Sequence, residues 1–363
     1  MVAVLLFIDH LTVNQLIVAS LMLFATSVFL VILIFVYLAI KKRRFNIEKN
    51  IDESLDNWIT ENILNDDESI IEVSEQLKTY FDDQKNHQFV INRLIAVRRN
   101  FSGSSLDKIV KLYQQFDFKN DSLKKIHSRH WFKKARGIYE LYMMNQLDME
   151  HEIAKHTNSP NEYIRMEAQT AIISFHGFEG LNFLETLTQP ITEWHQLKLM
   201  EQLNGFSVQV IQDISKWLKS ENKYVVMFAL KLTAVYQQLQ VHDEVAVCLI
   251  HPLEKIRTQA ILALAAIAND DTASLLINHY PTESHYNQKT ILQKIKNLVD
   301  DRNRDFLIAQ LDNLDNDFKL IVAEILIRNF EDGLKVLEKK AETDPVPFKD
   351  IFMHAKRTLY ELV

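Results

Sequence analysis

Glycine and proline are both scarce in this sequence. Only six of each occur among 363 residues, well below their usual share of a globular chain. Folds made of strands and tight turns, and the Gly-rich loops that hold phosphate groups, need more glycine than this. Long helices need little of either residue, because glycine costs backbone entropy in a helix and proline lacks the N–H donor. The scarcity predicts an all-α protein.

Cysteine is nearly absent as well. Cys248 is the single cysteine, so no disulfide can form within the chain, which suits a reducing compartment. It stands in an apolar run, residues 245–250, and free cysteines in such runs behave as small hydrophobic residues. We therefore expect Cys248 to be buried.

Residue sets for chemistry are also missing. The sequence has no Gly-x-x-x-x-Gly-Lys, no Gly-x-Ser-x-Gly and no Cys-x-x-Cys motif, which nucleotide hydrolysis, serine-esterase chemistry and thiol redox chemistry would need. His151 and His156 are one residue too far apart to share a helix face, and His127 and His130 have no further metal ligands nearby. The acids Asp312, Asp315 and Asp317 lack the spacing, glycine and glutamate of a calcium loop. We expect no catalytic residue, cofactor, metal or small-molecule substrate.

The charge balance gives little support to a nucleic-acid partner. The formal net charge is −7, whereas neutralising phosphates needs clustered Lys and Arg. The charges are unevenly distributed: residues 48–86 hold twelve acids against three lysines, and residues 119–136 hold seven bases against one acid. Binding of nucleic acid is therefore disfavoured for the chain as a whole.

One long hydrophobic run is present near the N-terminus. Residues 21–40 read LMLFATSVFLVILIFVYLAI, and fourteen of these twenty are Leu, Ile, Val or Phe. Twenty helical residues span about 30 Å, the thickness of a bilayer core. The run predicts a transmembrane helix, with residues 11–40 in contact with the membrane.

Four bases follow this run directly: Lys41, Lys42, Arg43 and Arg44. The segment before it has no Lys or Arg and one acid, Asp9. Because positive charge stays on the cytoplasmic side, we expect a single-pass protein of the cytoplasmic membrane with its N-terminus outside. A cleaved signal peptide would have the opposite charge arrangement, so residues 1–44 are interpreted as a membrane anchor with a basic flank. The four bases act as topology determinants or also contact anionic headgroups.

Beyond residue 50 apolar residues recur at helical spacing, and they do so with a fixed longer period. We call the first apolar position of each expected hairpin its opening residue. The opening residues are 30 to 32 residues apart, and His195 is the one that breaks the apolar pattern, so we expect Trp194 to pack in its place. The series is Phe132, Ile164, His195, Val225, Ile256, Tyr286, Phe318 and Phe348.

Proline positions support the same period. Pro160, Pro190, Pro252 and Pro281 each lie four or five residues before an opening residue, and Pro345 and Pro347 lie just before the last. Proline is tolerated in the first turn of a helix and damages its interior. The prolines therefore predict where the first helix of each hairpin begins.

Two of these segments resemble HEAT repeats, particularly the short bacterial form. Residues 159–168 read SPNEYIRMEA, and residues 251–260 read HPLEKIRTQA, continuing as ILALAAI. Both run from a proline through an apolar–Arg pair to an alanine, as that family's first helix does. The resemblance covers about 132–363 and implies an α-solenoid, a right-handed superhelix of helical hairpins. We assign residues 119–363 to an array of about eight units, and residues 45–118 to an acidic helical cap or degenerate repeats.

A second basic stretch lies at the start of this array. Lys125, Arg129 and Lys133 recur every four residues and would share one helix face, with Trp131 and Phe132 between them. This pattern suits an acidic partner or anionic lipid, and it equally fits a solvated face or one balanced by the acidic residues 48–86. The candidate contact residues are Lys124, Lys125, Arg129, Lys133, Lys134 and Arg136.

The sequence therefore favours a membrane-anchored cytoplasmic scaffold without catalysis, because HEAT-like arrays most often offer a curved surface for docking a protein. An alternative is an accessory subunit of a membrane machine, such as an envelope-glycan synthase or a secretion system, with polar residues of the spanning helix contacting a neighbour. A HEAT-like DNA-binding or glycosylase-type enzyme is a third option, which net acidity and the membrane segment disfavour.

Overall fold

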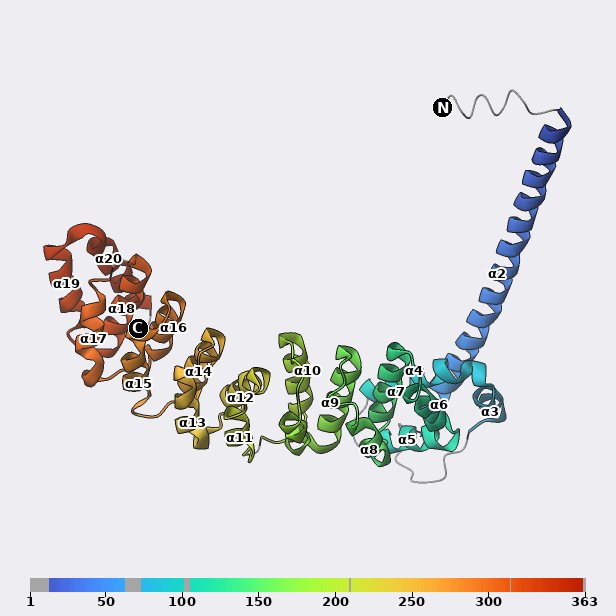
Figure 1. Cartoon of the computed structure of the whole chain (residues 1–363), viewed down its shortest axis with the longest axis horizontal. Coiled ribbons are helices and arrows are strands. Elements are labelled where there is room, and N and C mark those ends of the chain that lie inside the picture. The colour runs from blue at the N-terminus through green and yellow to red at the C-terminus, as the bar shows by residue number, and fades with distance from the viewer. Residues whose placement is uncertain (1–12, 63–72, 101–104, 209, 314, 362–363) are drawn as a thin grey trace. The chain divides into compact units, whose positions relative to one another are not determined.

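The computed structural model describes residues 13–62, 73–100, 105–208, 210–313 and 315–361 (Figure 1). Within these ranges every regular element is helical and no β-strand occurs, which confirms the expected all-α class. Residues 11 and 12 of the expected membrane segment, and part of the acidic stretch, lie outside the described residues. The chain divides into two compact units, Met1–Ser128 with Met143–Gln146, and Arg129–Tyr142 with Leu147–Val363.

Five helices of the first unit lie within the described ranges. In chain order they are α2 (Val13–Asn62), α3 (Glu75–Asp82), α4 (Gln84–Asn100), α5 (Ser105–Gln115) and α6 (Phe118–Ile126). The C-terminal part of α2 packs on α3 and α4, and α4 contacts α5 and α6. The core includes Ile51 and Leu55 of α2, and Phe81 packs edge-on against Phe118 at 5.5 Å between ring centroids.

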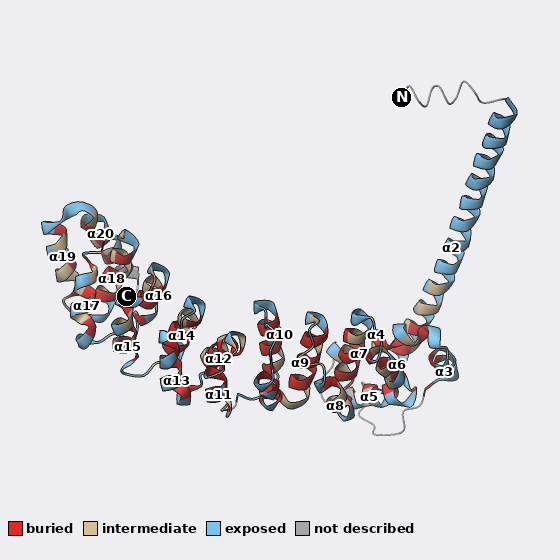
Figure 2. Ribbon diagram, viewed as in Figure 1, coloured by how far each residue is buried: buried red, intermediate tan, exposed pale blue. Residues whose placement is uncertain are grey.

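Helix α2 has two different halves (Figure 2). By length and composition it is the one described helix that could cross a membrane, with a mean hydropathy of 2.8 over its most apolar eighteen residues and none of that window buried. From Ile51 onward the same helix contributes buried residues to the core of the first unit. The apolar segment and the folded part are thus joined by unbroken helix.

The second unit consists of helical hairpins. Their first helices are α7 (Trp131–Met143), α9 (Glu162–His176), α10 (Glu193–Leu203), α12 (Lys223–Val235), α14 (Glu254–Ala266), α16 (His285–Ile295), α18 (Asn316–Asn329) and α20 (Pro345–Glu361), with Val346 non-helical. Between them lie η1 (Leu147–Met149), α8 (Glu150–Ala154), η2 (Gly177–Glu185), α11 (Ile214–Leu218), η3 (Leu239–Val241), α13 (His242–Val247), η4 (Cys248–Ile250), α15 (Thr272–His279), η5 (Tyr280–Thr282), η6 (Asp301–Asn303), α17 (Arg304–Gln310) and α19 (Gly333–Thr343).

The first helices of the second unit pack on one another in chain order. Contacts join α9 to α10, α12 to α14, α14 to α16, α16 to α18, and α18 to α20. Side chains link the remaining neighbours: the Tyr142 hydroxyl donates to Glu167 at 3.1 Å, and the Tyr236 hydroxyl donates to the Met200 carbonyl oxygen at 3.2 Å. Each hairpin therefore buries its apolar face against its neighbours, as repeat arrays do.

Most of the first helices begin at a side-chain cap. Asn161, Thr192, Asn222, Ser284 and Asp315 each accept a hydrogen bond from a backbone N–H of the helix that follows, which satisfies a donor left unpaired at a helix start. The prolines lie at or near the starts of first helices as predicted: Pro345 and Pro347 are in the first turn of α20, and Pro281 is in η5 ahead of α16. Pro160, Pro190 and Pro252 stand just before α9, α10 and α14.

Five of the eight opening residues are buried apolar side chains: Ile164, Val225, Ile256, Phe318 and Phe348. The expectation is wrong for Phe132 and Tyr286, which are exposed. In α7 the buried face begins one turn later, at Ala135. In α16 it begins one residue later, at Asn287.

His195 departs from the expectation in another way. The imidazole itself is fully buried at the opening position of α10, and Trp194 is exposed, so the packing role expected of Trp194 is wrong. Neither ring nitrogen has a hydrogen-bond partner. Burial, helped by the nearby charges of Arg165 and Lys198, lowers the pKa of His195 to about 3. His195 is thus neutral at physiological pH and packs as an apolar ring.

Candidate functional site

Two equivalent arginines fix the loops that precede α9 and α14. Arg165 Nη1 donates to the carbonyl oxygens of Ser159 at 2.6 Å and Pro160 at 3.4 Å. Arg257 Nη1 donates to those of His251 at 3.1 Å and Pro252 at 3.4 Å. The apolar–Arg pair of the sequence therefore has a physical role: each guanidinium satisfies the carbonyl groups of the turn that leads into its own helix.

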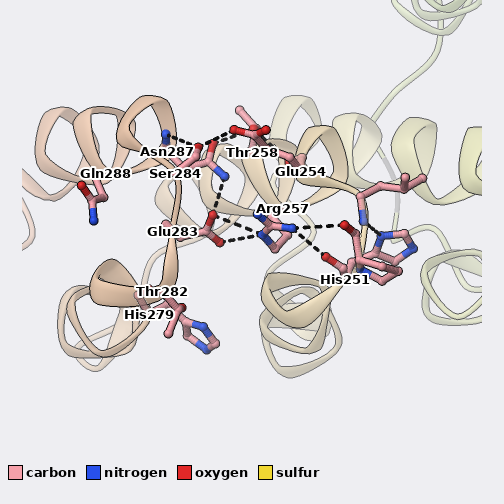
Figure 3. A network of polar contacts seen from close by, with 12 residues as sticks. His251, Glu254, Arg257, Thr258, His279, Thr282, Glu283, Ser284, Asn287 and Gln288 are labelled. Atoms are coloured by element: carbon pink, nitrogen blue, oxygen red, sulfur yellow. Dashed lines mark hydrogen bonds and ion pairs between the residues drawn. The ribbon is translucent and has the colours of Figure 1, made fainter.

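Each of these arginines also reaches the next hairpin. Arg165 Nη2 donates to the Pro190 carbonyl oxygen at 3.1 Å, and Arg257 Nε donates to Glu283 Oε1 at 2.9 Å (Figure 3). The Glu283 carboxylate also accepts from Asn287 Nδ2 at 2.8 Å. These contacts fix how successive hairpins sit against each other. They therefore also fix the spacing between side chains exposed on neighbouring hairpins.

An open aromatic groove lies between α7 and α9. Its volume is about 320 Å3, and it is lined by Trp131, Phe132, Ala135, Arg136, Tyr139, Tyr163 and Glu167. The rings of Trp131 and Tyr163 stack with centroids 4.9 Å apart and planes 24° apart. A groove of this kind, mostly apolar and with few charged groups, is a candidate binding surface.

Two charged groups at this groove are held in place. The Arg136 guanidinium lies over the Tyr139 ring at 5.2 Å from its centroid, and its Nε donates to the buried Glu140 carboxylate at 2.9 Å. Glu167 accepts from Lys198 Nζ at 2.8 Å and from the Tyr142 hydroxyl. Both charged side chains of the groove thus have partners within the chain.

The predicted basic flank lies on α2. Lys41, Lys42 and Arg43 are exposed. Arg44 is half-buried, and its guanidinium donates to Glu48 at 2.7 Å and to Asn86 Oδ1 on α4 at 2.9 Å. Arg44 thus has a structural role in the first unit, and the other three bases face solvent.

The second basic stretch does not form the expected helical stripe. Helix α6 ends at Ile126 and α7 begins at Trp131, so Lys125, Arg129 and Lys133 lie on two helices and the turn between them. Of the candidate contact residues, Lys124 and Lys125 belong to the first unit, and Arg129, Lys133, Lys134 and Arg136 belong to the second. The stripe is wrong because the turn at residues 127–130 breaks the helical spacing.

Several described acids of residues 48–86 form ion pairs with bases close by. Asp52 and Asp56 pair with Arg93 of α4 at 2.6 and 2.9 Å, and Glu75 pairs with Lys78. Lys124 pairs with Asp121 of its own helix at 3.0 Å. These ion pairs join neighbours within the first unit.

A second cavity, of about 230 Å3, lies where the chain leaves α10 and enters α11. It is lined by Phe178, Glu179, Asn182, Val210, Ile211, Gln212, Asp213 and Trp217. The indole of Trp217 is buried, and its Nε1 has no hydrogen-bond partner. This donor and the nearby carboxylates are polar groups of a kind that could orient a small ligand.

The histidine and aspartate pairs considered in the sequence do not gather into metal sites. Across the described ranges no group of three His, Cys, Asp or Glu side chains is placed to hold a metal ion. The aspartates near residue 315 serve the array: Asp317 pairs with Lys289 at 2.6 Å, and His285 lies 3.0 Å from Asp315. Their clustering reflects contacts between α16 and α18.

Sequence reasoning missed the groove. In the sequence, Trp131 stands out as a ring between bases, Phe132 both as such a ring and as an opening residue, and Tyr163 as part of a repeat motif. The signal that would have found it is the residue directly before each opening residue, which is aromatic at positions 131, 163, 194 and 224. Successive helix residues point about 100° apart, so the residue before a buried one can face solvent, and these four were candidates for exposure.

No protein-family model matches the sequence, and no curated protein does so either. Among solved structures, the chain is similar to an engineered protein, at 14% identity and a TM-score of 0.37 over 77% of this chain and 86% of that one. It is also similar to the complex of CpcE and CpcF of phycocyanin lyase from Nostoc sp., at 11% identity and a TM-score of 0.26, over 76% of this chain and 96% of that one. A designed armadillo repeat protein matches at 13% identity and a TM-score of 0.22, over 65% of this chain and 97% of that one. These low TM-scores say nothing of what this chain binds.

Proposed function

We propose that this protein is a membrane-anchored scaffold whose HEAT-type helical array recruits a protein partner to the cytoplasmic face of the inner membrane. The observation that carries the proposal is helix α2, which is apolar and exposed at its N-terminal end and enters the core of the first unit at Ile51. An apolar helix of this length, left uncovered by the rest of the chain, needs a bilayer around it.

The junction between these two halves supports the expected orientation. Lys41, Lys42 and Arg43 are exposed directly after the apolar segment, where they would hold this side in the cytoplasm. Arg44 is tied to Asn86 on α4. Removal of a signal peptide would cut a helix that the first unit uses for its own packing.

The array of the second unit supports a binding role over a catalytic one. Its polar contacts join one hairpin to the next, as Lys296 does with Glu324 at 2.7 Å. The groove between α7 and α9 offers aromatic surface and fixed charges. Tethering would raise the local concentration of a weakly bound partner at the membrane.

Membrane insertion and orientation can be tested together. Cys248 is buried, so labelling with a membrane-impermeant maleimide would report cysteines introduced elsewhere. We expect His10→Cys to react in intact cells and Lys42→Cys to react only after permeabilisation, with the full chain resisting alkaline carbonate extraction. Release of the chain by carbonate, or labelling of Lys42→Cys from outside, would contradict the proposal.

Recruitment is tested by replacing residues 1–40 with an unrelated spanning helix. A scaffold would keep its partner in a detergent pull-down, whereas a subunit that depends on contacts within the membrane would lose it. The hydroxyls of Thr26 and Ser27 already donate to the Leu23 carbonyl oxygen, each at 2.8 Å. The donors of these two hydroxyls are thus used within α2 rather than offered to a neighbouring helix, and we expect the partner to be retained.

A further inference from the structure

In three hairpins of the array the second helix begins at an aspartate. Asp213, Asp271 and Asp332 are the N-cap residues of α11, α15 and α19, and none of their side chains caps its own helix. Two of the three pair with an arginine of an adjoining hairpin: Asp271 with Arg302 at 3.1 Å, and Asp332 with Arg304. An arginine is thus the usual partner of this position.

Asp213 differs from the other two. Its carboxylate has no hydrogen bond or ion pair with any described residue. The lysines that follow it in the chain have other partners, because Lys216 pairs with Glu185 at 2.6 Å and Lys219 lies 3.7 Å from Glu244. Asp213 instead borders the cavity of about 230 Å3 between η2 and α11.

The lining of this cavity is acidic. Glu179 of η2 adds a second carboxylate without a hydrogen bond or ion pair to any described residue. No described Lys, Arg or His lines the cavity, and Asn182 and Gln212 contribute amide groups. Two carboxylates without a base attract a cation. Several acceptors in one place suit a guanidinium group in particular, because it has five N–H donors.

Trp217 gives the cavity a buried donor. Its side chain is 2% exposed and lines the cavity, and its indole Nε1 has no hydrogen-bond partner among the described residues. A bare cation offers no acceptor to this N–H, whereas an arginine within a protein chain also carries carbonyl oxygens. With Phe178, the indole makes part of the lining aromatic, which suits guanidinium better than a strongly hydrated ammonium.

The chain around the cavity is held from two sides. A Cβ added at Gly177 of η2 would lie 2.7 Å from Cδ1 of Phe206, so that ring packs directly on the glycine. The Ile211 backbone N–H donates to Gln238 Oε1 at 2.7 Å, in the next hairpin. The volume of about 230 Å3 corresponds to roughly eight water molecules at about 30 Å3 each. That is room enough for one arginine side chain.

We propose that this cavity binds an arginine side chain of the protein that the scaffold recruits. The guanidinium group donates to the carboxylates of Glu179 and Asp213, and a carbonyl oxygen of the bound peptide accepts from Trp217 Nε1. The arginine thus takes the role that Arg302 and Arg304 have at the equivalent aspartates. The proposal rests on the scaffold function and adds the chemistry that the partner must present.

The first test is fluorine NMR of the full chain in detergent, with its tryptophans replaced by a fluorinated tryptophan. The chain has four tryptophans, and Trp217→Phe assigns the signal of Trp217. The probes are N-acetyl-arginine methylamide, its citrulline analogue, which has a similar shape and no charge, and butylguanidine, which has the charge and no peptide group.

We expect the arginine probe to shift the Trp217 signal saturably and to bind roughly tenfold more tightly than either other probe. Asp213→Asn and Glu179→Gln should each weaken its binding roughly tenfold. Glu201→Gln is the matched control, because it removes an exposed acid of α10 that does not line the cavity, and it should leave binding unchanged. Circular dichroism should show no loss of helix in these three variants.

Several results of this titration would overturn the proposal. An unmoved Trp217 signal, equal affinity for the citrulline analogue, or unchanged affinity in both cavity variants would show that the carboxylates do not bind a cation here. Equal affinity for butylguanidine would show that the site takes a small guanidinium compound rather than an arginine within a protein.

The source of the arginine is tested by photo-crosslinking in cells. p-Benzoylphenylalanine replaces Val210, which lines the cavity and is 67% exposed, or Val247 of α13, which is 65% exposed and serves as the matched control. We expect position 210 to capture the pull-down partner through a peptide that contains arginine. Asp213→Asn should lower that yield roughly tenfold and leave any capture at position 247 unchanged.

The outcomes separate this proposal from the scaffold function. If the pull-down recovers a partner that position 210 does not capture, or captures equally well in Asp213→Asn, the scaffold function stands and the cavity is not its site. If the pull-down recovers no partner, the scaffold function fails. The titration with the arginine probe then still decides whether the cavity binds guanidinium.

Discussion

The Arg257 guanidinium and the Glu283 carboxylate form an ion pair across two neighbouring hairpins, with Nε 2.9 Å from Oε1 and the Glu283 side chain 2% exposed. The same guanidinium holds the turn before α14 through the His251 carbonyl oxygen. One side chain thus determines where a helix starts and how the next hairpin sits on it (Figure 3).

Removing Arg257 should destabilise the array strongly. In Arg257→Ala the Glu283 carboxylate stays buried without its cation, and breaking such a pair costs about 3 kcal/mol. Lys216→Ala, which breaks the exposed pair with Glu185 at 2.6 Å, should cost less than about 1 kcal/mol. Urea denaturation of the detergent-solubilised chain, followed by circular dichroism, measures both. Equal midpoints for the two variants would contradict this role of Arg257.

Acid should destabilise the array through His195. The folded pKa of about 3 lies below the unfolded value of about 6.5, so the stability due to neutral His195 is complete above pH 6.5 and is lost as the pH falls toward 3. Between pH 7 and pH 5 the loss is about 2 kcal/mol. His195→Leu keeps an apolar side chain there and should remove most of this pH dependence. Thermal unfolding at the two pH values, with and without the substitution, is the measurement.

Gly333 should tolerate no side chain. A Cβ at this position would overlap the Leu326 carbonyl oxygen of α18, which belongs to backbone and cannot swing aside. Gly333→Ala should therefore cost about 2 kcal/mol or more, as overpacking does. At Gly205 the nearest atom to an added Cβ is the Gln202 carbonyl oxygen at 3.5 Å, an ordinary contact. Gly205→Ala is the matched control, and a comparable loss of stability in both variants would be contrary to expectation.

The thiol of Cys248 should react slowly while the chain is folded. It is buried, as the sequence predicted, and burial raises its pKa to about 11. At pH 8 the thiolate fraction is then roughly 100-fold below that of a free cysteine. Reaction with a coloured disulfide reagent should be slow in buffer and fast in urea. Rapid reaction of the native chain would show that the hairpin around α13 opens readily.

The sequence indicated the helical class and the period because both depend on residues that act locally. Six prolines and a repeated apolar position suffice to predict where first helices begin. His195 and Tyr286 were mispredicted because burial there is decided by neighbours. Asn287 is buried in α16 since Thr258 and Glu283 of the adjoining elements supply its hydrogen bonds, and no pattern within α16 contains that information.

The candidate site was less accessible to sequence reasoning. The bases at Lys133 and Arg136 were noticed, but the turn after Ile126 separates them from Lys125. Likewise, the groove requires Trp131 and Tyr163 to meet across thirty-two positions of sequence. Such a contact depends on how neighbouring hairpins stack. Side chains such as Arg165 determine that stacking by bonding to the next hairpin, and a sequence pattern does not show such contacts.

Helix α2 runs without a break from Val13 to Asn62, so its two ends rotate together about the helix axis. Each residue turns a helix by about 100°, so adding one residue after Ile40 would rotate the first unit by about a quarter turn about the axis of α2, relative to the apolar segment. Adding seven residues would return it to within about 20° of its original orientation. A rotation of the apolar segment about the helix axis would be transmitted in the same way to Ile51 and the helices that pack around it.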